Sequence, residues 1–202
     1  MTRRMPLILV ILAAAACSGG DRAEGAQQPD SGRRETAVFA GGCFWSVESN
    51  FEHIPGVVTA VSGYAGGRTA RPTYEQVVAG GTGHLEAVQV TFDPARISYR
   101  TLVDRFWRTI DPTDARGQFC DRGASYGTAV FATESQRSAA NASRSEAARV
   151  IGPARFVTPV RPATRFWPAE AEHQDFARRN PVRYGGYSRF CGRAAHLRQI
   201  WS

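Results

Sequence analysis

The clearest pattern in the chain is an alternation of apolar and other side chains over residues 84–93, which predicts a β-strand. Successive side chains of a strand point to opposite sides, so one face of this strand carries Glu86, Val88, Val90 and Phe92. Apolar runs predict further strands at residues 36–40, 57–64, 126–133 and 156–160.

Helices are predicted where apolar residues recur at spacings of three and four. Such segments cover residues 43–53, 98–110, 133–151, 170–178 and 193–201. Thr73 and Gln76 fit a capping box, which predicts a short helix there. Because strands and helices interleave without regular alternation, we predict an α+β fold: a two-layer sandwich with a mixed, mainly antiparallel sheet, flanking helices and extensive coil.

The amino-terminal part of the chain has a different pattern. A basic start precedes a short apolar run over residues 7–12, and small residues then lead into Cys17. This order predicts a signal peptide over residues 1–16 and resembles a bacterial lipoprotein signal, with Cys17 as the lipidated residue. Ala14 departs from that signal, which usually has Leu there, and ordinary cleavage after Ala16 is the alternative.

Either form of cleavage predicts export, to a bacterial periplasm or cell envelope, and we expect a lipid on Cys17 to anchor the protein there. Residues 17–35 lack an apolar period and predict a flexible tether. We predict that residues 36–202 form a single folded domain.

The charge pattern limits the possible partners. All 25 basic residues are arginine, and the formal net charge is +7. The arginines are scattered, with no basic stripe interleaved with aromatic residues, so we expect no nucleic-acid partner. A chain without lysine has no amine for a lysine Schiff base, which excludes that class of enzyme. We expect a monomer.

Cysteine usage indicates redox chemistry. If Cys17 carries the anchor, the exported domain keeps Cys43, Cys120 and Cys191. Three is an odd number where disulfides persist, so at least one thiol stays free or cycles. No pair has C-x-x-C spacing and no Cys/His group has zinc-site spacing, so we expect no metal.

Cys43 lies in Gly41-Gly42-Cys43-Phe44-Trp45, at a predicted strand-to-helix turn. Free N–H groups and the helix dipole at such a turn favour a thiolate, which is the nucleophilic form. Phe44 and Trp45 can form an apolar wall beside the sulfur. The alternative is a structural cysteine packed among core aromatics.

Glu86 is the single charged residue on its strand face. Burial of a carboxyl raises its pKa, so Glu86 could hold a proton near neutral pH. The alternative places Glu86 at a solvated rim, where the strand begins.

Together these residues carry a family resemblance over residues 36–191. The motifs occur in order as Gly42-Cys43-Phe44-Trp45, Pro72-Thr73-Tyr74, Gly83-His84-Leu85-Glu86-Ala87-Val88, Cys120-Asp121-Arg122-Gly123-Ala124-Ser125-Tyr126 and Phe166-Trp167-Pro168-Ala169-Glu170. In this order they resemble the peptide methionine sulfoxide reductases of the A class, which reduce the S epimer of methionine sulfoxide in proteins.

The resemblance implies a role for each matching residue. Cys43 would attack the sulfoxide sulfur, and Glu86 would protonate the oxygen. The remaining matches are Tyr74 and Tyr126 as donors to that oxygen, Asp121 as an orienting group, and Phe44 and Trp45 as the pocket for the S-methyl group.

The resemblance also implies a thiol cycle without a metal or organic cofactor. A sulfenic acid on Cys43 would condense with Cys191 or Cys120, and a thioredoxin-like protein would reduce the disulfide. We favour Cys191, because a Gly/Tyr-rich segment before it could form a mobile tail. Cys120, beside Asp121, is the alternative. Oxidised proteins of the cell envelope would be the substrates.

The chain departs from the family at three positions. Gly127 follows Tyr126 where Arg is usual, and Trp167 and Phe176 stand where tyrosines are common. His84 and His173 fit the motifs, and we expect both to be structural hydrogen-bonding residues. Two rival functions remain: a thiol peroxidase or disulfide oxidoreductase that needs no acid, and an anchored binding protein without turnover.

Overall fold

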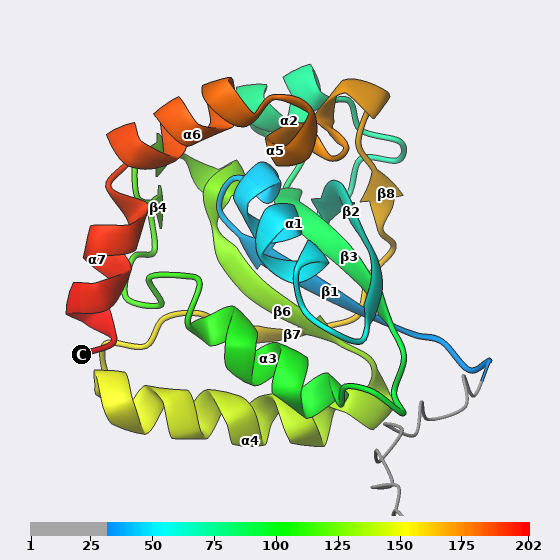
Figure 1. The fold of residues 1–202 in the computed structure, drawn as a ribbon, viewed down its shortest axis with the longest axis vertical. Helices are drawn as coiled ribbons and strands as arrows, with labels where there is room; N and C mark the ends of the chain where they lie inside the picture. Colours follow the sequence, from blue (N-terminus) through cyan, green and yellow to red (C-terminus); the bar gives the residue numbers. More distant parts are fainter. Residues whose placement is uncertain (1–31) are drawn as a thin grey trace, which may run out of the picture.

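The structure, a computed structural model, describes residues 32–202, and Figure 1 shows its fold. The predicted signal peptide, the lipidation site Cys17 and most of the predicted tether lie outside these residues. Within residues 32–202, no helix combines the length and the apolar character needed to cross a membrane.

A six-stranded sheet forms the centre of the molecule. Its strands, in spatial order, are β7 (Val160–Pro162), β6 (Thr128–Ala132), β1 (Glu35–Gly41), β3 (Leu85–Phe92), β2 (Val57–Ala65) and β8 (Trp167–Pro168). Neighbouring strands are antiparallel except for the parallel pair β6 and β7. The predicted mixed, mainly antiparallel sheet is therefore confirmed. A separate two-stranded ribbon pairs β4 (Gly117–Gln118) with β5 (Asp121–Arg122).

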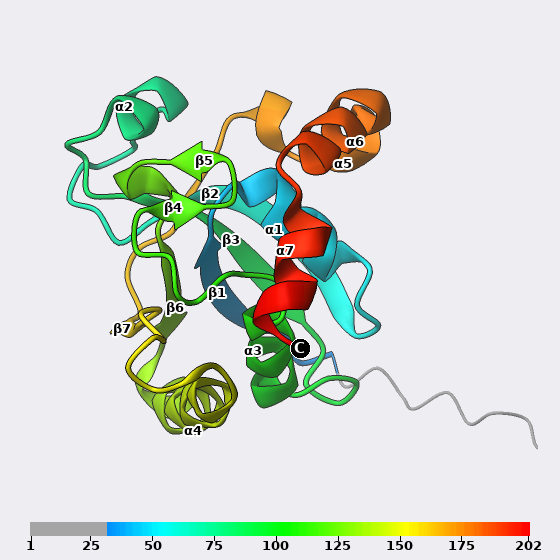
Figure 2. The same cartoon turned by 90° about the vertical axis from the view of Figure 1, so that its left-hand side faces the viewer.

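Helices cover one face of this sheet, as Figures 1 and 2 show. They are α1 (Phe44–Glu52), α2 (Tyr74–Ala79), α3 (Tyr99–Trp107), α4 (Glu134–Ile151), α5 (Phe176–Arg179), α6 (Pro181–Phe190) and α7 (Arg193–Ile200), with 3-10 turns at Ala124–Tyr126 and Ala171–His173. Thr73 closes the predicted capping box of α2, and Thr133 closes a capping box at the start of α4.

The main core lies between the sheet and the helices. Phe39 of β1 lies at its centre, with its ring 4.7 Å from that of Phe51 on α1 and 5.0 Å from that of Phe106 on α3. The opposite face of the sheet carries mostly small residues, and Phe166 packs against it. Because Glu86 shares its strand face with Val88, the carboxyl points into the helical layer.

Two predicted elements are wrong in their bounds. Residues 156–159 form a loop before β7, because Phe156 packs on Trp107 and the Val157 N–H donates to the carbonyl of Pro112. The single helix predicted at residues 170–178 is interrupted at Asp175, whose φ of 53° is left-handed. In both segments the pattern of apolar residues indicates which side chains are buried. The backbone conformation, however, is determined by contacts with distant residues.

The Gly/Tyr-rich segment before Cys191 also differs from its prediction. It forms α6, with Pro181 in the first turn and Cys191 at the C-terminal cap, whereas no helix was predicted there. Proline fits the first turn of a helix because its missing N–H has no partner to lose there. α6 and α7 follow one another along the edge of the helical layer, as Figure 2 shows.

Candidate active site

Cys43 lies between β1 and α1, at the N-terminal cap of the helix. The preceding Gly42 has a φ of 79°, and a Cβ there would lie 2.5 Å from the Cβ of Gln118. Glycine is therefore required on both conformational and steric grounds. The Cys43 side chain is a free thiol and is 5% exposed.

Glu86 meets this turn from β3. Its side chain is 2% exposed, and its carboxylate accepts a hydrogen bond from the backbone N–H of Phe44 at 2.9 Å. Burial raises the pKa of Glu86 to about 8, more than the Phe44 N–H lowers it, and the charge of Asp121 adds to the increase. The carboxyl thus lies in the interior beside Cys43 and does not lie at a solvated rim.

The thiol of Cys43 does not gain the low pKa that its position at the helix start predicts. Burial, followed by the charge of Glu86, raises the pKa of Cys43 to about 12. The neighbouring Tyr187 hydroxyl and the Trp45 N–H lower the pKa of Cys43 by less. The helix N-terminus fails to dominate because desolvation is larger and because the Phe44 N–H binds the Glu86 carboxylate.

Two tyrosines lie close to Glu86. Burial, followed by the charge of Glu86, raises the pKa of both Tyr74 and Tyr126, and each tyrosine also affects the pKa of the other, so their hydroxyls lie close together. Glu170 positions this group: its carboxylate accepts from the Tyr74 N–H at 2.9 Å and from the Tyr64 hydroxyl at 2.8 Å. The pair therefore presents phenolic O–H groups beside a buried acid.

Aromatic rings form an apolar wall around the same point. Phe44 is buried, and its ring lies 6.3 Å from that of Tyr74 and 5.2 Å from that of His173. Trp45 stacks on Phe176 at 3.7 Å. The Trp45 indole N–H also donates to Nδ1 of His173 at 3.3 Å, and burial lowers the pKa of this imidazole. His173 therefore serves as a neutral hydrogen-bond acceptor that fixes the Trp45 ring.

The three departures from the family pattern have different surroundings. Phe176 completes the stack on Trp45, where a hydroxyl is not needed for the contact. Trp167 lies on the edge strand β8, with the Arg165 guanidinium 4.3 Å from its ring. Gly127 follows the 3-10 turn that holds Tyr126, in extended backbone. Within residues 32–202, none of the three residues makes a hydrogen bond or a ring contact with Cys43 or Glu86, so the central group is built without them.

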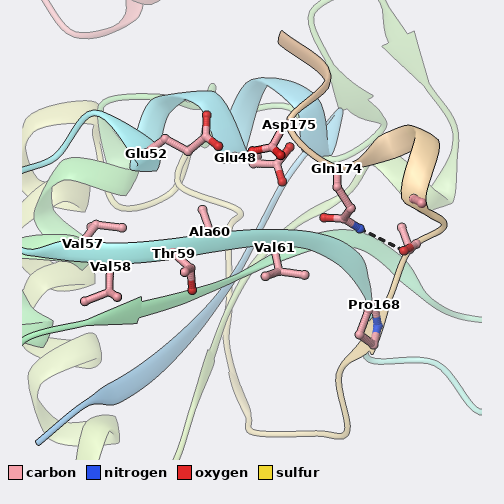
Figure 3. A pocket seen from close by; sticks show the side chains of 12 residues that line it. Glu48, Glu52, Val57, Val58, Thr59, Ala60, Val61, Pro168, Gln174 and Asp175 are labelled. Atoms are coloured by element: carbon pink, nitrogen blue, oxygen red, sulfur yellow. Dashed lines mark hydrogen bonds between the residues drawn. The ribbon is translucent and has the colours of Figure 1, made fainter. Parts of the chain in front are cut away.

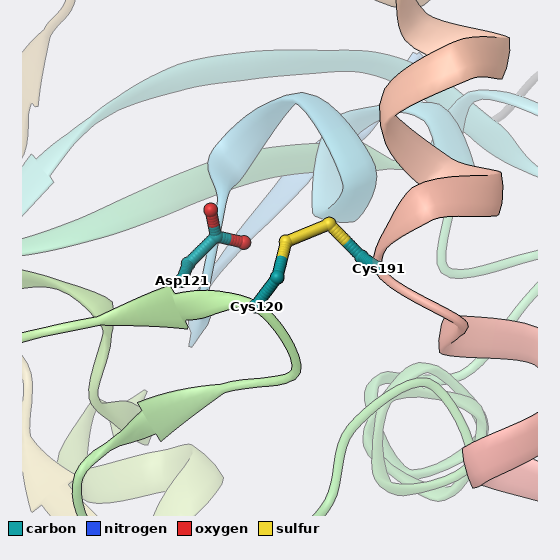
Figure 4. Close-up of side chains that lie close together, drawn as sticks. All are labelled: Cys120, Asp121 and Cys191. Atoms are coloured by element: carbon teal, nitrogen blue, oxygen red, sulfur yellow. A yellow bond between two sulfur atoms is a disulfide. The ribbon is translucent and has the colours of Figure 1, made fainter.

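Cys120 and Cys191 are joined in a disulfide, and Figure 4 shows it beside Asp121. The bond links the β4–β5 ribbon to the end of α6. Within residues 32–202 these three residues are the one group with several potential metal-binding atoms close together, and two of its atoms are the bonded sulfurs. Both candidate resolving thiols are thus paired with each other, and Cys43 is left free.

Sequence reasoning missed Tyr187 and Tyr184 of α6. The Tyr187 hydroxyl donates to the carboxylate of Asp121 and lies against the thiol of Cys43. The Tyr184 hydroxyl donates to Oγ of Ser46 at 3.3 Å. Their spacing of three residues after a proline was the available signal, since it places both on one face of a helix.

A cavity of about 700 Å³ opens beside α1, away from Cys43 (Figure 3). Its acidic residues are Glu48, Glu52 and Asp175, and burial raises the pKa of Glu48 to about 7. Gln174 borders it and donates to the carbonyl of Ala169 at 2.9 Å. None of the residues predicted as catalytic lines this cavity.

Comparisons with known proteins agree with the geometry. The family model "Peptide methionine sulfoxide reductase" matches residues 35–202. Peptide methionine sulfoxide reductase MsrA 2 of Caulobacter vibrioides is 47% identical over 197 residues, which cover 98% of this chain and 99% of the relative. The protein of the same name in Rhizobium meliloti is 52% identical over 166 residues, 82% of each chain.

Solved structures show the same fold. Reduced Mxr1 of Saccharomyces cerevisiae aligns with a TM-score of 0.71 at 28% identity, over 76% of this chain and 89% of that chain. The complex of Mxr1 with Trx2 aligns with a TM-score of 0.51 at 22% identity, over 76% of this chain and 91% of that chain.

The pKa of Glu86 generates a prediction for the folded protein. Infrared spectroscopy should detect a protonated carboxyl that titrates near pH 8 and that is absent from Glu86→Gln. Glu48→Gln serves as the matched control, because Glu48 titrates near pH 7 from a different environment. A carboxylate signal for Glu86 at pH 6 would contradict the assignment.

The raised pKa of Glu86 also predicts how the free energy of unfolding changes with pH. The pKa of Glu86 is higher in the folded state than in the unfolded chain, so its protonation stabilises the fold fully below about pH 4.5. That contribution should be lost as the pH rises through about 8, and the loss should be smaller in Glu86→Gln.

Proposed function

The chain belongs to the peptide methionine sulfoxide reductase family and is an oxidoreductase of the A class, and on this premise we propose that Cys43 and Glu86 carry out its reaction on methionine-(S)-sulfoxide in proteins. One observation supports this assignment above the others. The buried Glu86 carboxyl is held by the N–H of Phe44, the residue directly after the free thiol of Cys43. A proton donor and a nucleophile therefore lie together in an apolar site.

In the first step, the sulfur of Cys43 attacks the sulfoxide sulfur while Glu86 donates its proton to the sulfoxide oxygen. This attack forms a bond between the two sulfurs and leaves the oxygen as a hydroxyl on the methionine sulfur. The hydroxyl then passes to the Cys43 sulfur as the S–S and S–O bonds to the methionine sulfur break, so methionine leaves as the thioether and Cys43 becomes a sulfenic acid. The electron pair of the Cys43 sulfur reduces the methionine sulfur. Glu86 suits this role because its pKa of about 8 leaves it protonated at neutral pH.

Protonation of Glu86 also helps to form the nucleophile. The negative charge of Glu86 is one of the causes that raise the pKa of Cys43. When Glu86 is neutral that repulsion is absent, so the acid form of Glu86 and the thiolate of Cys43 favour each other. Tyr74 and Tyr126 lie where they can donate to the oxygen as it gains negative charge.

Substrate selection follows from the aromatic wall. Phe44 and Trp45 present apolar ring surface beside Cys43, and His173 and Phe176 fix the Trp45 ring. A methyl group on the sulfoxide sulfur fits such a surface, whereas the oxygen requires the polar side with Glu86 and the tyrosines. With methyl and oxygen positions assigned, only one configuration at sulfur directs the peptide chain outward.

The disulfide supports a cycle of three thiols. The sulfenic acid on Cys43 condenses with a second thiol, releasing water and forming a disulfide. Attack by the third thiol on that disulfide forms Cys120–Cys191 and returns Cys43 as a thiol, which is the state of the structure. The dithiol of a partner protein then reduces the Cys120–Cys191 disulfide. This reaction leaves two cysteine thiols on this chain and a disulfide on the partner.

A thioredoxin-like protein is the proposed reductant. Cys120 is exposed, and Phe190, next to Cys191, is 87% exposed, so a second protein can reach this disulfide without entering the aromatic pocket. The yeast relative has been solved with Trx2, which supports this class of partner.

Turnover on separated epimers tests the function. The purified protein with dithiothreitol should reduce a methionine-(S)-sulfoxide peptide and leave the R epimer unchanged. Cys43→Ser should abolish turnover, and Glu86→Gln should lower kcat by about 100-fold or more, the usual range for loss of a general acid.

The outcomes of that assay separate the rival functions. Full activity in Glu86→Gln would favour a thiol peroxidase or disulfide oxidoreductase. A folded wild-type protein that reduces neither epimer would contradict the proposed function.

Peptide mapping after a single turnover tests the order of the thiols. If Cys191 reacts first, Cys120→Ser should accumulate a Cys43–Cys191 disulfide, and Cys191→Ser should retain a sulfenic acid that dimedone traps. Accumulation of Cys43–Cys120 in Cys191→Ser, at the wild-type rate, would assign the first step to Cys120.

We further propose that the protein is exported and repairs oxidised proteins of the cell envelope, anchored by a lipid on Cys17. The support is the signal-like order of residues 1–17. Mass spectrometry of the protein from a bacterial membrane should find a diacylated Cys17 at the amino terminus. An unmodified Cys17 at the amino terminus would indicate a soluble exported form, and an intact Met1 would contradict export.

A further inference from the structure

Tyr187 contacts the reacting sulfur but has no role in the cycle described above. Its hydroxyl donates to Asp121 and lies against the Cys43 thiol, and its ring meets that of Trp45 edge-on at 6.2 Å and 82°. A sulfoxide must approach the same sulfur along the same Trp45 surface. Tyr187 therefore occupies space that the proposed substrate needs.

Two bridges connect the segment that carries Tyr187 to the β4–β5 ribbon. One is the Cys120–Cys191 disulfide, and the other is the hydrogen bond between Tyr187 and Asp121. Cys120 and Asp121 are adjacent, and the Cys191 N–H donates to the Tyr187 carbonyl at 3.0 Å, one helical turn away. Figure 4 shows the disulfide joining the ribbon to this end of α6. The covalent bridge thus holds the tyrosine bridge in place.

The rest of the contacts make α6 the weakly held element of this region. α6 has no fully buried residue, and Val182 and Phe190 on it are each 87% exposed. Gly192, with a φ of 61° and open space around it, separates α6 from α7. A helix with so few buried contacts can detach at low cost in free energy once its covalent link is broken.

α7, in contrast, is fixed to the body of the protein. The buried Arg193 donates to the carbonyl of Thr109 at 2.6 Å, and its guanidinium lies 4.3 Å from the Phe119 ring. His196 binds Asp111 at 2.6 Å, and the Trp201 indole N–H donates to the carbonyl of Ile110 at 3.0 Å. Movement of α6 about Gly192 would therefore leave α7 in place.

We propose that Tyr187 is a redox-linked gate on Cys43: the closed Cys120–Cys191 disulfide holds it over the sulfur, and reduction of the disulfide releases it and admits the substrate. The gate rests on the proposed thiol cycle, in which this disulfide is the last oxidised state. The disulfide form of the protein therefore does not admit a sulfoxide to Cys43, and reduction of the disulfide restores access.

Alkylation of Cys43 by iodoacetamide tests the gate on the full chain, with the Cys43 peptide quantified by mass spectrometry. The rate should be low in the disulfide form and at least about 10-fold higher in Cys120→Ser/Cys191→Ser, since access limits reaction of a buried thiol. Tyr187→Ala should react at the higher rate even with the disulfide closed. The assay needs no sulfoxide turnover, so its outcome is separate from that of the proposed function.

Tyr184→Ala is the matched control. Tyr184 lies on the same helix and binds Ser46, so its loss should leave the rate in the disulfide form within about 2-fold of wild type. Equal acceleration in both tyrosine variants would mean general loosening of α6 and would overturn the gate, as would a wild-type rate in Tyr187→Ala. If Tyr187→Ala does not fold, the double serine variant still tests the gate. Equal rates of Cys43 alkylation in the wild-type disulfide form and in the double serine variant would be enough to overturn it.

Discussion

The hydrogen bond from the Phe44 N–H to the Glu86 carboxyl is the contact on which the site depends. It joins the middle strand β3 to the start of α1, and it satisfies both a free N–H of a buried helix end and a buried carboxyl. Cys43 is the residue before Phe44, so the same bond fixes the sulfur beside the acid. Gly42, which precedes Cys43, has a left-handed backbone conformation and packs on Gln118, and this fixes the backbone of the turn.

Burial favours the neutral form of both Glu86 and Cys43. Glu86 keeps its proton at neutral pH, and the thiol of Cys43 resists losing its own. These two groups are therefore uncharged at rest, which is the state of lowest free energy in an apolar interior. In the proposed reaction, a sulfoxide brings a strongly polar S–O bond into this interior, and the O–H groups of Glu86, Tyr74 and Tyr126 would bind it without reorganisation of solvent.

Local interactions account for what the sequence predicted well. The strand around Glu86, the capping box at Thr73 and the helix that begins after Thr133 depend on neighbours in the chain, and all formed as predicted. The interruption at Asp175 and the helical course of α6 depend on distant partners, since Gln174 binds the backbone of Ser62 and Tyr187 binds Asp121. The motifs located Cys43 and Glu86, whereas Tyr187 and the pairing of Cys120 with Cys191 required the three-dimensional structure.

The position of the Cys120–Cys191 disulfide gives the oxidised substrate protein and the reductant separate contact regions on the surface. In the proposed cycle, oxygen leaves the substrate inside the aromatic pocket, while electrons enter through the Cys120–Cys191 disulfide, whose Cys120 is an exposed residue next to Asp121. A bulky oxidised protein and a bulky reductant therefore need not compete for one opening. Oxidised proteins of very different shape could therefore be substrates, provided that one oxidised methionine reaches the pocket, because the reductant reacts at a different site.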